Sequence, residues 1–304
     1  MRKFKIKLEI AKVIIEIKSQ DPLLRIRKEE NPFYRKPFND FIYKGREKHS
    51  VSITIQHVNA LPPFDNVMQL FNANNGWVLY KQNKKYVYKI FLDGCNAVQV
   101  IQSNKKFDKI EVFLLSKSSK RYIVDSLYSI CNFLRVILIH YLAIRKQGIC
   151  IHSSGVGVSE DVGLLFAGKS GSGKSTIAGI WNRHCKTRII NDDQIIIRKS
   201  KKKYFMYGSP WQGKNIRNRC FVSHKATHIA KMFFIQHASK NIIQQVIARE
   251  ALTLLYPVLF SIYWHKTSVK NSVLFCHELI RVIPCYRLGF VNNKRVVNFI
   301  KNVL

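Results

Sequence analysis

The stretch that most constrains the fold of this chain is glycine-rich and spans residues 168–176. Two glycines enclose four residues, and a lysine and a serine follow the second: the stretch reads Gly168, Lys169, Ser170, Gly171, Ser172, Gly173, Lys174, Ser175 and Thr176. The apolar run Val162–Ala167 before it is typical of a buried strand. Behind it, apolar residues recur at helical spacing, at Ile177, Ile180 and Trp181.

This context predicts a phosphate-binding loop between a strand and a helix. Glycines let the backbone turn tightly and point successive N–H groups inward, and the helix N-terminus adds its positive dipole end. Lys174 would then reach the β and γ phosphates of a nucleotide, and the Ser175 hydroxyl would bind Mg²⁺. The alternative is a Gly/Ser-rich linker before an ordinary helix, but the strand, loop, lysine, hydroxyl and helix agree with one another.

Composition predicts a globular protein of one large or two ordinary domains, because 47% of its 304 residues are hydrophobic and 23% are charged. The seven cysteines are scattered and odd in number, which favours a reduced, cytoplasmic protein. Residues 1–18 lack the continuous apolar core of a signal peptide, so we expect no export. The apolar run at 122–144 carries Asp125, Arg135 and His140, which favours a buried helix over a membrane span.

A formal net charge of +33 raises the question of nucleic-acid binding. The excess is spread along the chain, with 27 Lys and Arg against 12 Asp and Glu up to Cys150, and 24 against 6 after it. No helix-turn-helix, zinc-finger or aromatic RNA-binding signature accompanies it. We therefore favour a solvated surface that helps to attract an acidic partner, with nucleic acid as the weaker interpretation.

The first part of the chain reads as strands. Apolar and charged residues alternate at 4–17 and 50–56, a hairpin is predicted at 76–90, and further strands at 97–102 and 109–115. We predict an antiparallel β module over residues 1–122. A connecting helix follows over 123–147, with Asp125 or Ser126 as its N-cap and Gly148 as its stop.

From residue 148 onward the pattern alternates between strands and helices. Beyond the glycine-rich stretch we predict strands at 187–190, 194–197, 204–207, 229–235 and 284–290, a basic turn at 199–203, and helices at 242–259, 271–282 and 293–304. The predicted fold class is thus α+β, with an N-terminal antiparallel β module followed by an α/β domain over 148–304.

Asp192 and Asp193 are adjacent and follow an apolar strand, about twenty residues after the glycine-rich stretch. Phosphoryl transfer needs an acidic metal partner opposite the phosphate loop and a carboxylate that takes the proton of the attacking hydroxyl. The alternative is a solvated turn, since Asn-Asp-Asp is also good turn chemistry. His152 stands just before the phosphate-loop strand, and a lone histidine of this kind is more often structural than catalytic.

In combination, these motifs resemble a known family. His-Ser-Ser at 152–154, the glycine-rich stretch and Asn-Asp-Asp at 191–193 are similar in order and spacing to the catalytic domain of bacterial HPr serine kinase/phosphorylase, whose fold is related to that of phosphoenolpyruvate carboxykinase. Residues 207–213 and 286–288 look more like the HPr-kinase-like proteins of peptide-modification gene clusters. The resemblance covers residues 148 to 304.

The resemblance implies an ATP- and Mg²⁺-dependent kinase that phosphorylates a serine of a small protein or peptide. Asp192 would be the general base, Asp193 with Ser175 the metal ligands, and His152 a group that orients Asp192 or contacts phosphate. The family's hexamers also imply self-association.

The chain departs from the family in lacking the late glycine- and arginine-rich loop of the HPr-specific enzymes, which argues against HPr as the acceptor. The loop at 208–213, with Lys214, Arg217 and Arg219 behind it, would take that place. Phosphorylation of free serine at the same site and a non-catalytic nucleotide- or peptide-binding protein remain the alternatives.

Overall fold

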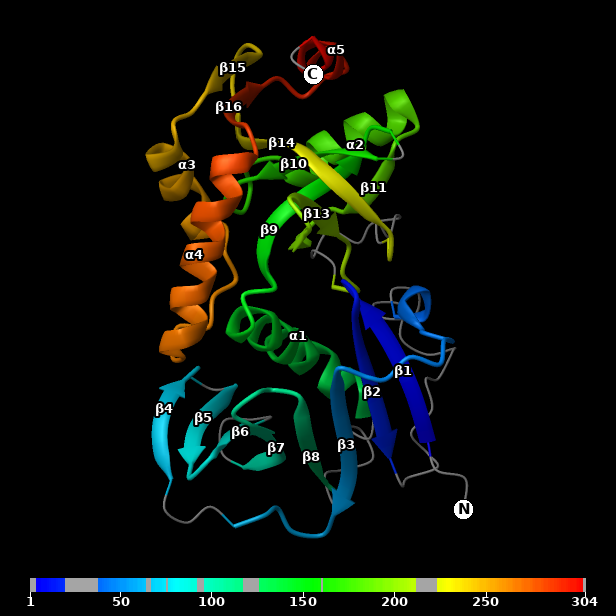
Figure 1. Ribbon diagram of the computed structural model, residues 1–304, viewed down its shortest axis with the longest axis vertical. Helices are drawn as coiled ribbons and strands as arrows, with labels where there is room; N and C mark the ends of the chain where they lie inside the picture. Colours follow the sequence, from blue (N-terminus) through cyan, green and yellow to red (C-terminus); the bar gives the residue numbers. More distant parts are fainter. Residues whose placement is uncertain are drawn as a thin grey trace. The chain divides into compact units, whose positions relative to one another are not determined.

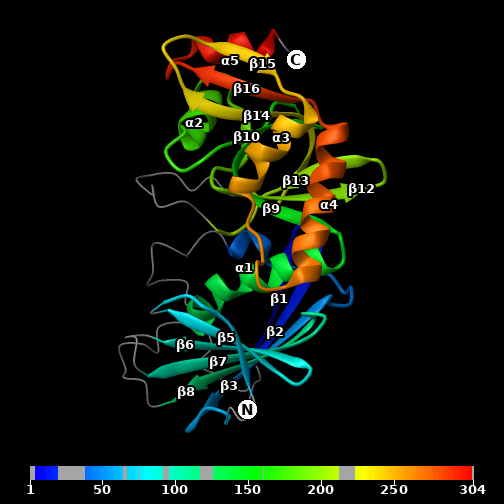
Figure 2. The ribbon, with the colours of Figure 1, turned by 90° about the vertical axis from the view of Figure 1, so that its left-hand side faces the viewer.

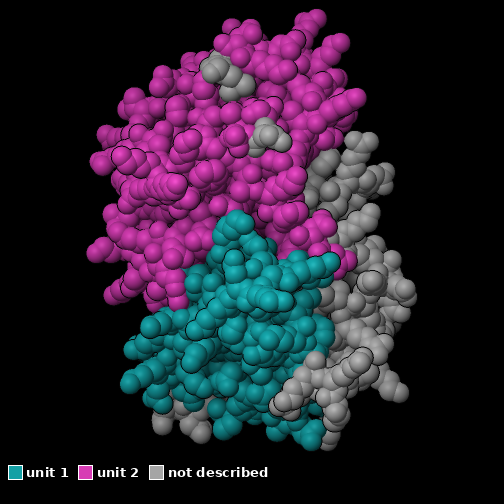
Figure 3. All heavy atoms as spheres, turned by 45° about the vertical axis from the view of Figure 1, so that its right-hand side comes forward, with its two compact units in different colours: residues 1–35, 42–141 teal, residues 36–41, 142–304 magenta. Residues whose placement is uncertain are grey.

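The computed structural model describes residues 4–19, 38–63, 67–74, 76–91, 96–116, 126–159, 161–211 and 223–302, with only the backbone described for 126–132. The chain divides into two compact units, which Figure 3 shows in different colours. Unit 1 comprises residues 1–35 and 42–141, and unit 2 comprises 36–41 and 142–304. The protein is mixed α+β: each unit contains an eight-stranded sheet, and the chain also forms α-helices.

Unit 1 is built on one sheet in the order β1-β2-β3-β8-β7-β6-β5-β4 (Figure 1). Its strands are β1 (Phe4–Ile10), β2 (Val13–Ser19), β3 (Val51–Val58), β4 (Met68–Asn72), β5 (Trp77–Gln82), β6 (Lys85–Phe91), β7 (Ala97–Asn104) and β8 (Lys109–Leu115). The predicted hairpin and the strands that follow it are confirmed, since β5 to β8 pair antiparallel in sequence order.

Two predictions for this sheet are wrong. The sheet is mixed rather than antiparallel, because β3 runs parallel to both β2 and β8. The chain leaves β3, forms β4 to β7, and returns as β8 beside β3 in the same direction. The alternating stretch at 4–17 is also two strands rather than one: Ala11 and Lys12 adopt positive φ angles of 50° and 61° and close a tight hairpin. Ala-Lys lacks the glycine or asparagine that usually marks such a turn.

The helix α1 (Ser126–Ile144) contributes aromatic packing to unit 1. The Phe133 ring meets Tyr88 edge-on at 4.4 Å between centroids, and His140 stacks on Phe107 at 3.9 Å. The helix ends at Ile144, and Lys146 turns the chain with a positive φ, so the helix ends three residues before the predicted end at 147. The division between the units falls inside α1, whereas the sequence prediction set this helix apart from both flanking parts.

The sheet of unit 2 has the order β10-β9-β12-β13-β14-β16-β15, with β11 also paired to β9. Its strands are β9 (Gly148–Gly157), β10 (Val162–Ala167), β11 (Arg188–Asn191), β12 (Gln194–Ser200), β13 (Lys203–Tyr207), β14 (Ala226–His237), β15 (Ile242–Gln245) and β16 (Cys285–Phe290). Strand β10 pairs antiparallel with β9 and parallel with β14, so the strand before the glycine-rich stretch is central.

Two hydrophobic cores flank this sheet. One joins sheet residues to α3 (Ala248–Leu255), the 3-10 turn η2 (Tyr256–Val258) and α4 (Lys266–Val282). The other joins them to α2 (Lys174–Cys185) and α5 (Arg295–Lys301). The strands are apolar on both sides because helices cover both faces (Figure 2). A 3-10 turn, η1 (Asn39–Phe41), also belongs to unit 2.

One predicted helix of unit 2 is wrong at its start. Residues 242–245 form the edge strand β15, paired antiparallel to β16, and α3 begins only at Ala248. Ile242, Ile243 and Val246 fit a helical pattern, but pairing with β16 satisfies the backbone of this segment instead. In contrast, α4 begins five residues before the predicted start at 271. Among the described residues, no helix combines the length and apolar character needed to cross a membrane.

Candidate active site

The glycine-rich stretch connects the end of β10 to the start of α2, between a central buried strand and a helix that packs on the sheet. Gly171 and Gly173 have φ angles of 81° and 97°, a left-handed conformation that side chains disfavour. A Cβ on Gly173 would lie 2.6 Å from the Phe290 ring and 2.9 Å from His237. Both the conformation and the space at residue 173 therefore require glycine.

Lys174 is folded back over this loop. Its Nζ donates to the main-chain oxygens of Gly168 (3.0 Å) and Lys169 (2.9 Å), and the residue is 6% exposed. Burial lowers the pKa of the Lys174 ammonium, and the negative charge of Asp193 raises it in part. Lys174 and Asp193 therefore interact electrostatically across the site, although 19 positions separate them in the sequence.

Asp192 and Asp193 form the turn between β11 and β12. Strand β9 brings this turn to the glycine-rich loop, because it pairs with β10 along one edge and with β11 and β12 along the other. Hydroxyl groups from both sides donate to the Asp192 main-chain oxygen, from Ser154 at 2.9 Å and from Ser175 at 3.4 Å. The Ser153 N–H donates to the Asp193 main-chain oxygen at 3.0 Å.

The two carboxylates have different electrostatic environments. Burial, together with the charge of Asp193, raises the pKa of Asp192 to about 6. Burial also acts to raise the pKa of Asp193, but hydrogen bonds from His152 and Gln194 and the positive charge of Lys174 outweigh it and lower that pKa. The pKa of one carboxyl of the pair is thus lowered, and that of the other is raised to about 6.

His152, on β9, lies beside Asp193 rather than Asp192. Its Nε2 is 3.0 Å from the Asp193 Oδ1, with both side chains largely buried. The Phe260 ring lies near this imidazole, 6.3 Å away between centroids, and the Phe260 N–H donates to the Cys150 oxygen. Phe260, in the segment after η2, therefore packs beside His152.

The structure brings together the glycine-rich loop, Lys174, Ser175, the Asp192–Asp193 turn and His152, all of which were predicted from sequence. It also adds residues that sequence reasoning did not assign a role: Ser154, Asn191, Gln194 and Phe260. Asn191 and Gln194 flank the acidic pair, and the turn-forming character of Asn-Asp-Asp was a signal for Asn191. Phe260 had no such signal, since only tertiary pairing brings it to β9.

The loop predicted to meet the acceptor is described up to Trp211. Trp211 is 5% exposed, so its side chain packs inside the unit. Gln212, Gly213, Lys214, Arg217 and Arg219 lie outside the described residues.

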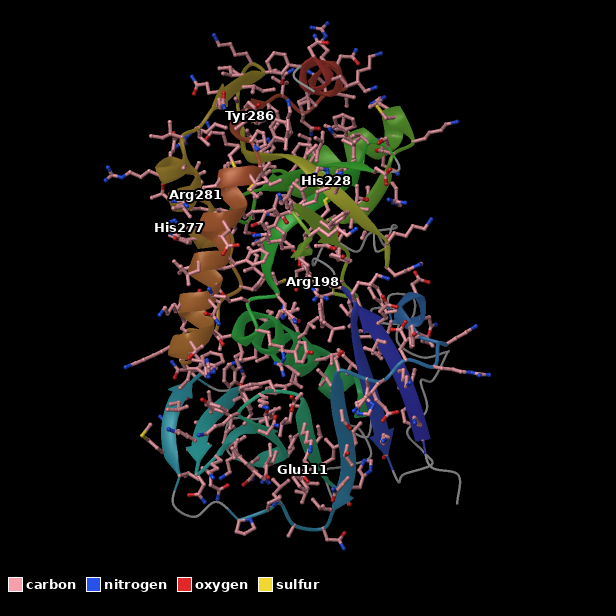
Figure 4. The ribbon with its side chains drawn as sticks, in the orientation of Figure 1. Glu111, Arg198, His228, His277, Arg281 and Tyr286 are labelled. Atoms are coloured by element: carbon pink, nitrogen blue, oxygen red, sulfur yellow. The ribbon has the colours of Figure 1, made fainter. Side chains whose placement is uncertain are left out.

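Basic side chains occur on several elements of unit 2 (Figure 4). Arg198 on β12 donates to the Gln147 main-chain oxygen at 3.2 Å, whereas His277 and Arg281 are exposed along α4. The Lys231 ammonium lies 5.5 Å from the centre of the Tyr286 ring. Positive charge is therefore distributed over unit 2 and is not confined to the glycine-rich loop.

Comparison of the chain with protein-family models finds no match, and comparison with curated proteins finds none either.

Proposed function

We propose that this protein is an ATP-dependent kinase that transfers the γ-phosphate to a serine hydroxyl of a small protein or peptide. The observation that carries the proposal is the convergence of Lys174, at the start of α2, with two carboxylates of divergent pKa. Two adjacent carboxyl groups with separated pKa values are the usual basis for dividing acid–base and metal-binding roles. The resemblance to HPr serine kinase/phosphorylase supports the same assignment.

The glycine-rich loop would hold the triphosphate. Backbone N–H groups of residues 168–176 and the N-terminal end of α2 favour anions, and Lys174 uses only two of its three N–H donors on loop carbonyls. A polyphosphate at this place would be held by groups that need little rearrangement. Preorganised donors of this kind are the main source of catalysis in phosphoryl transfer.

Asp192 would act as the general base. With a pKa of about 6 it is mostly ionised at neutral pH, yet it is more basic than an ordinary aspartate. The serine oxygen forms a bond to the γ phosphorus, the bond from that phosphorus to the β–γ bridging oxygen breaks, and ADP leaves. The serine proton passes to Asp192.

The donor set of the site fits Mg²⁺. Ser175 and Asp193 supply a hydroxyl and an ionised carboxylate, which are hard oxygen ligands. Among the described residues there is no cluster of three or more His, Cys, Asp or Glu side chains that could hold a metal, and Mg²⁺ bound with a nucleotide needs only one or two carboxylates. The ion would neutralise charge on the phosphates, and Ser175 and Asp193 would hold it.

His152 would then support Asp193, one of the two proposed metal ligands. Its Nε2 contact with Asp193 keeps that carboxylate ionised and fixes its direction. This role differs from the orientation of Asp192 that the resemblance implies. A neutral asparagine at residue 152 would keep the shape of the contact with Asp193 but would weaken the electrostatic support for the ionised carboxylate.

The test is transfer of labelled γ-phosphate from Mg²⁺–ATP by the purified protein, offered serine-containing peptides, including acidic ones, and free serine in separate reactions. We expect label on a peptide serine, and no transfer by Lys174→Ala or Asp192→Asn. Nucleotide binding should survive in Asp192→Asn, because that side chain contacts the acceptor proton rather than the phosphates. Full activity of Asp192→Asn would remove Asp192 from the mechanism.

The same assay separates the alternatives. Label on free serine but on no peptide would indicate a small-molecule kinase. Nucleotide binding without transfer to any acceptor would favour a non-catalytic binding protein. Binding of nucleic acid that weakens steeply with salt would support the charge-driven interpretation, and this binding should be measured with the same preparation.

A further inference from the structure

The buried amide of Asn191 connects the Asp192–Asp193 turn to a segment that is distant in the sequence, residues 208–211. Asn191 is fully buried at the end of β11. Its Oδ1 accepts hydrogen bonds from the N–H groups of Asp193 and Gln194, both at 2.8 Å. These two bonds close the turn that carries both carboxylates.

The other end of the same amide holds residues 208–211. The Asn191 Nδ2 donates to the main-chain oxygens of Ser209 (2.9 Å) and Trp211 (3.0 Å). Both donor hydrogens and both acceptor lone pairs of the amide are therefore used, which is the complete set for an asparagine. A buried network satisfied in this way specifies one arrangement, because losing any partner leaves a buried polar group unpaired.

A second set of contacts joins the same two segments. The Ser209 hydroxyl, which is fully buried, donates to the Gln194 main-chain oxygen at 2.9 Å, and the Gln194 amide donates to the Asp193 Oδ2 at 3.1 Å. Residues 208–211 are thus connected to the carboxylate itself through Gln194.

The backbone packs too closely at this junction for any side chain at residue 208. A Cβ on Gly208 would lie 2.6 Å from the Ile190 oxygen and 2.0 Å from the Ser223 oxygen, and the Ser223 N–H donates to that Ile190 oxygen at 3.0 Å. Both Trp211 and Ser223 are therefore held by the last two residues of β11. The end of β11 therefore holds both residues 208–211 and Ser223 in place.

We propose that Asn191 is a positioning residue, which holds the Asp192–Asp193 turn and residues 208–211 as one rigid unit and thereby sets the geometry of the base. The catalytic consequence rests on the proposed kinase function. Asn191 contacts neither nucleotide nor acceptor in this proposal, so we expect it to act much more on the rate of transfer than on nucleotide affinity. Displacement of a catalytic group by about 1 Å can lower a rate by about 100-fold.

Two variants separate the halves of the amide. Asn191→Ala removes every hydrogen bond of this amide. We expect kcat for phosphate release or transfer from Mg²⁺–ATP to fall about 100-fold, with KM for ATP within about twofold. Asn191→Asp keeps an acceptor for the Asp193 and Gln194 N–H groups but loses the donor for Ser209 and Trp211. Ser209→Ala removes the hydroxyl that donates to Gln194 and that lies 3.5 Å from the Asn191 Nδ2, but it keeps the Ser209 main-chain oxygen that Asn191 binds. It is the milder variant if the others fold poorly, and we expect kcat to fall about fivefold.

Asn293→Ala and Asn293→Asp are matched controls. The Asn293 Oδ1 accepts from the Arg295 N–H at 3.0 Å, so it closes a similar turn, but it is exposed before α5. Both control variants should keep wild-type kcat. Unchanged kcat in folded Asn191→Ala and Ser209→Ala would overturn the proposal.

A second readout does not depend on activity. Emission from Trp211 is isolated as the difference between each protein and its Trp211→Phe counterpart. If Asn191 holds the Trp211 backbone, Asn191→Ala shifts this emission to longer wavelength, and Asn293→Ala does not. Unshifted Trp211 emission in Asn191→Ala refutes the link between the two segments. If the wild-type protein has no kinase activity but Asn191→Ala still shifts the Trp211 emission, the kinase proposal is refuted and the link between the segments stands.

Discussion

Replacing Asp192 with asparagine should make the protein more stable while abolishing transfer. Burial and the neighbouring Asp193 raise the pKa of Asp192 from 3.8 to about 6, so the fold disfavours its ionised form. A difference of about 2 pKa units corresponds to about 3 kcal/mol of unfolding free energy at pH 8. The asparagine side chain is similar in shape and carries no charge, so Asp192→Asn removes this cost.

The sign of the effect depends on pH. Well below pH 3.8 the Asp192 carboxyl is protonated in both the folded and the unfolded state, and the variant gains nothing. As pH rises from 4 through 6, the folded wild-type protein must ionise an unfavourable carboxyl, and the advantage of Asp192→Asn grows to its full value. Thermal unfolding followed by tryptophan emission should show a midpoint about 6 to 12 °C higher for the variant at pH 8, and nearly equal midpoints at about pH 3.

Asp193→Asn is the matched control, because it should behave in the opposite way. Contacts with His152 and Gln194 lower the pKa of Asp193, so its ionised form stabilises the fold above pH 4. Neutralising it should lower the midpoint at pH 8, with a smaller loss as pH falls. Equal stability of Asp192→Asn and wild type at pH 8, or a gain that persists undiminished at about pH 3, would refute the electrostatic reasoning.

Three further predictions concern single residues. Gly173→Ala should destabilise unit 2 by about 1–3 kcal/mol and abolish nucleotide binding, because residue 173 has both a positive φ and no room for a Cβ. Gly171 also has a positive φ, but the space around its Cβ position is open, so Gly171→Ala should cost only about 1 kcal/mol. Thermal unfolding and nucleotide titration compare the two variants. Lys174→Ala should weaken ATP binding far more than AMP binding, because the lysine reaches only the terminal phosphates; equal losses for both nucleotides would place Lys174 elsewhere. In unit 1, burial would raise the pKa of Glu16, but Lys18 and Lys5 lower it to about 2. Glu16→Gln should therefore lower the free energy of unfolding above pH 4.5, and the loss should shrink as pH approaches 2. A loss that does not depend on pH in denaturation curves would contradict this.

Local chemistry was sufficient to predict much of the site. Gly171 and Gly173 adopt a left-handed backbone that glycine allows, and the apolar run Val162–Ala167 indicated the strand that leads into the loop. The strands β5 to β8 were equally readable, because each is short and pairs antiparallel with the next strand in the sequence. Features of this kind depend on residues a few positions apart.

Two errors show where local patterns fail. Residues 242–245 have apolar positions that suit a helix, but pairing with β16, more than forty residues further on, makes them a strand. The parallel pairing of β3 with β8 was also beyond prediction, since nothing at 51–58 records which strand will return beside it. Register and direction in a sheet are decided by distant partners.

The sequence by itself determined the types of chemical group available: a glycine-rich loop with a lysine and a hydroxyl, two adjacent carboxyl groups, and a histidine upstream. Only the tertiary structure decided their environments. Strand β9 pairs with β10, β11 and β12, and this pairing places His152 on Asp193, buries Asp192 and makes Asn191 the anchor of residues 208–211. The pKa of a carboxyl group depends on its burial and on charges a few ångströms away, and both are properties of the folded chain rather than of its local sequence.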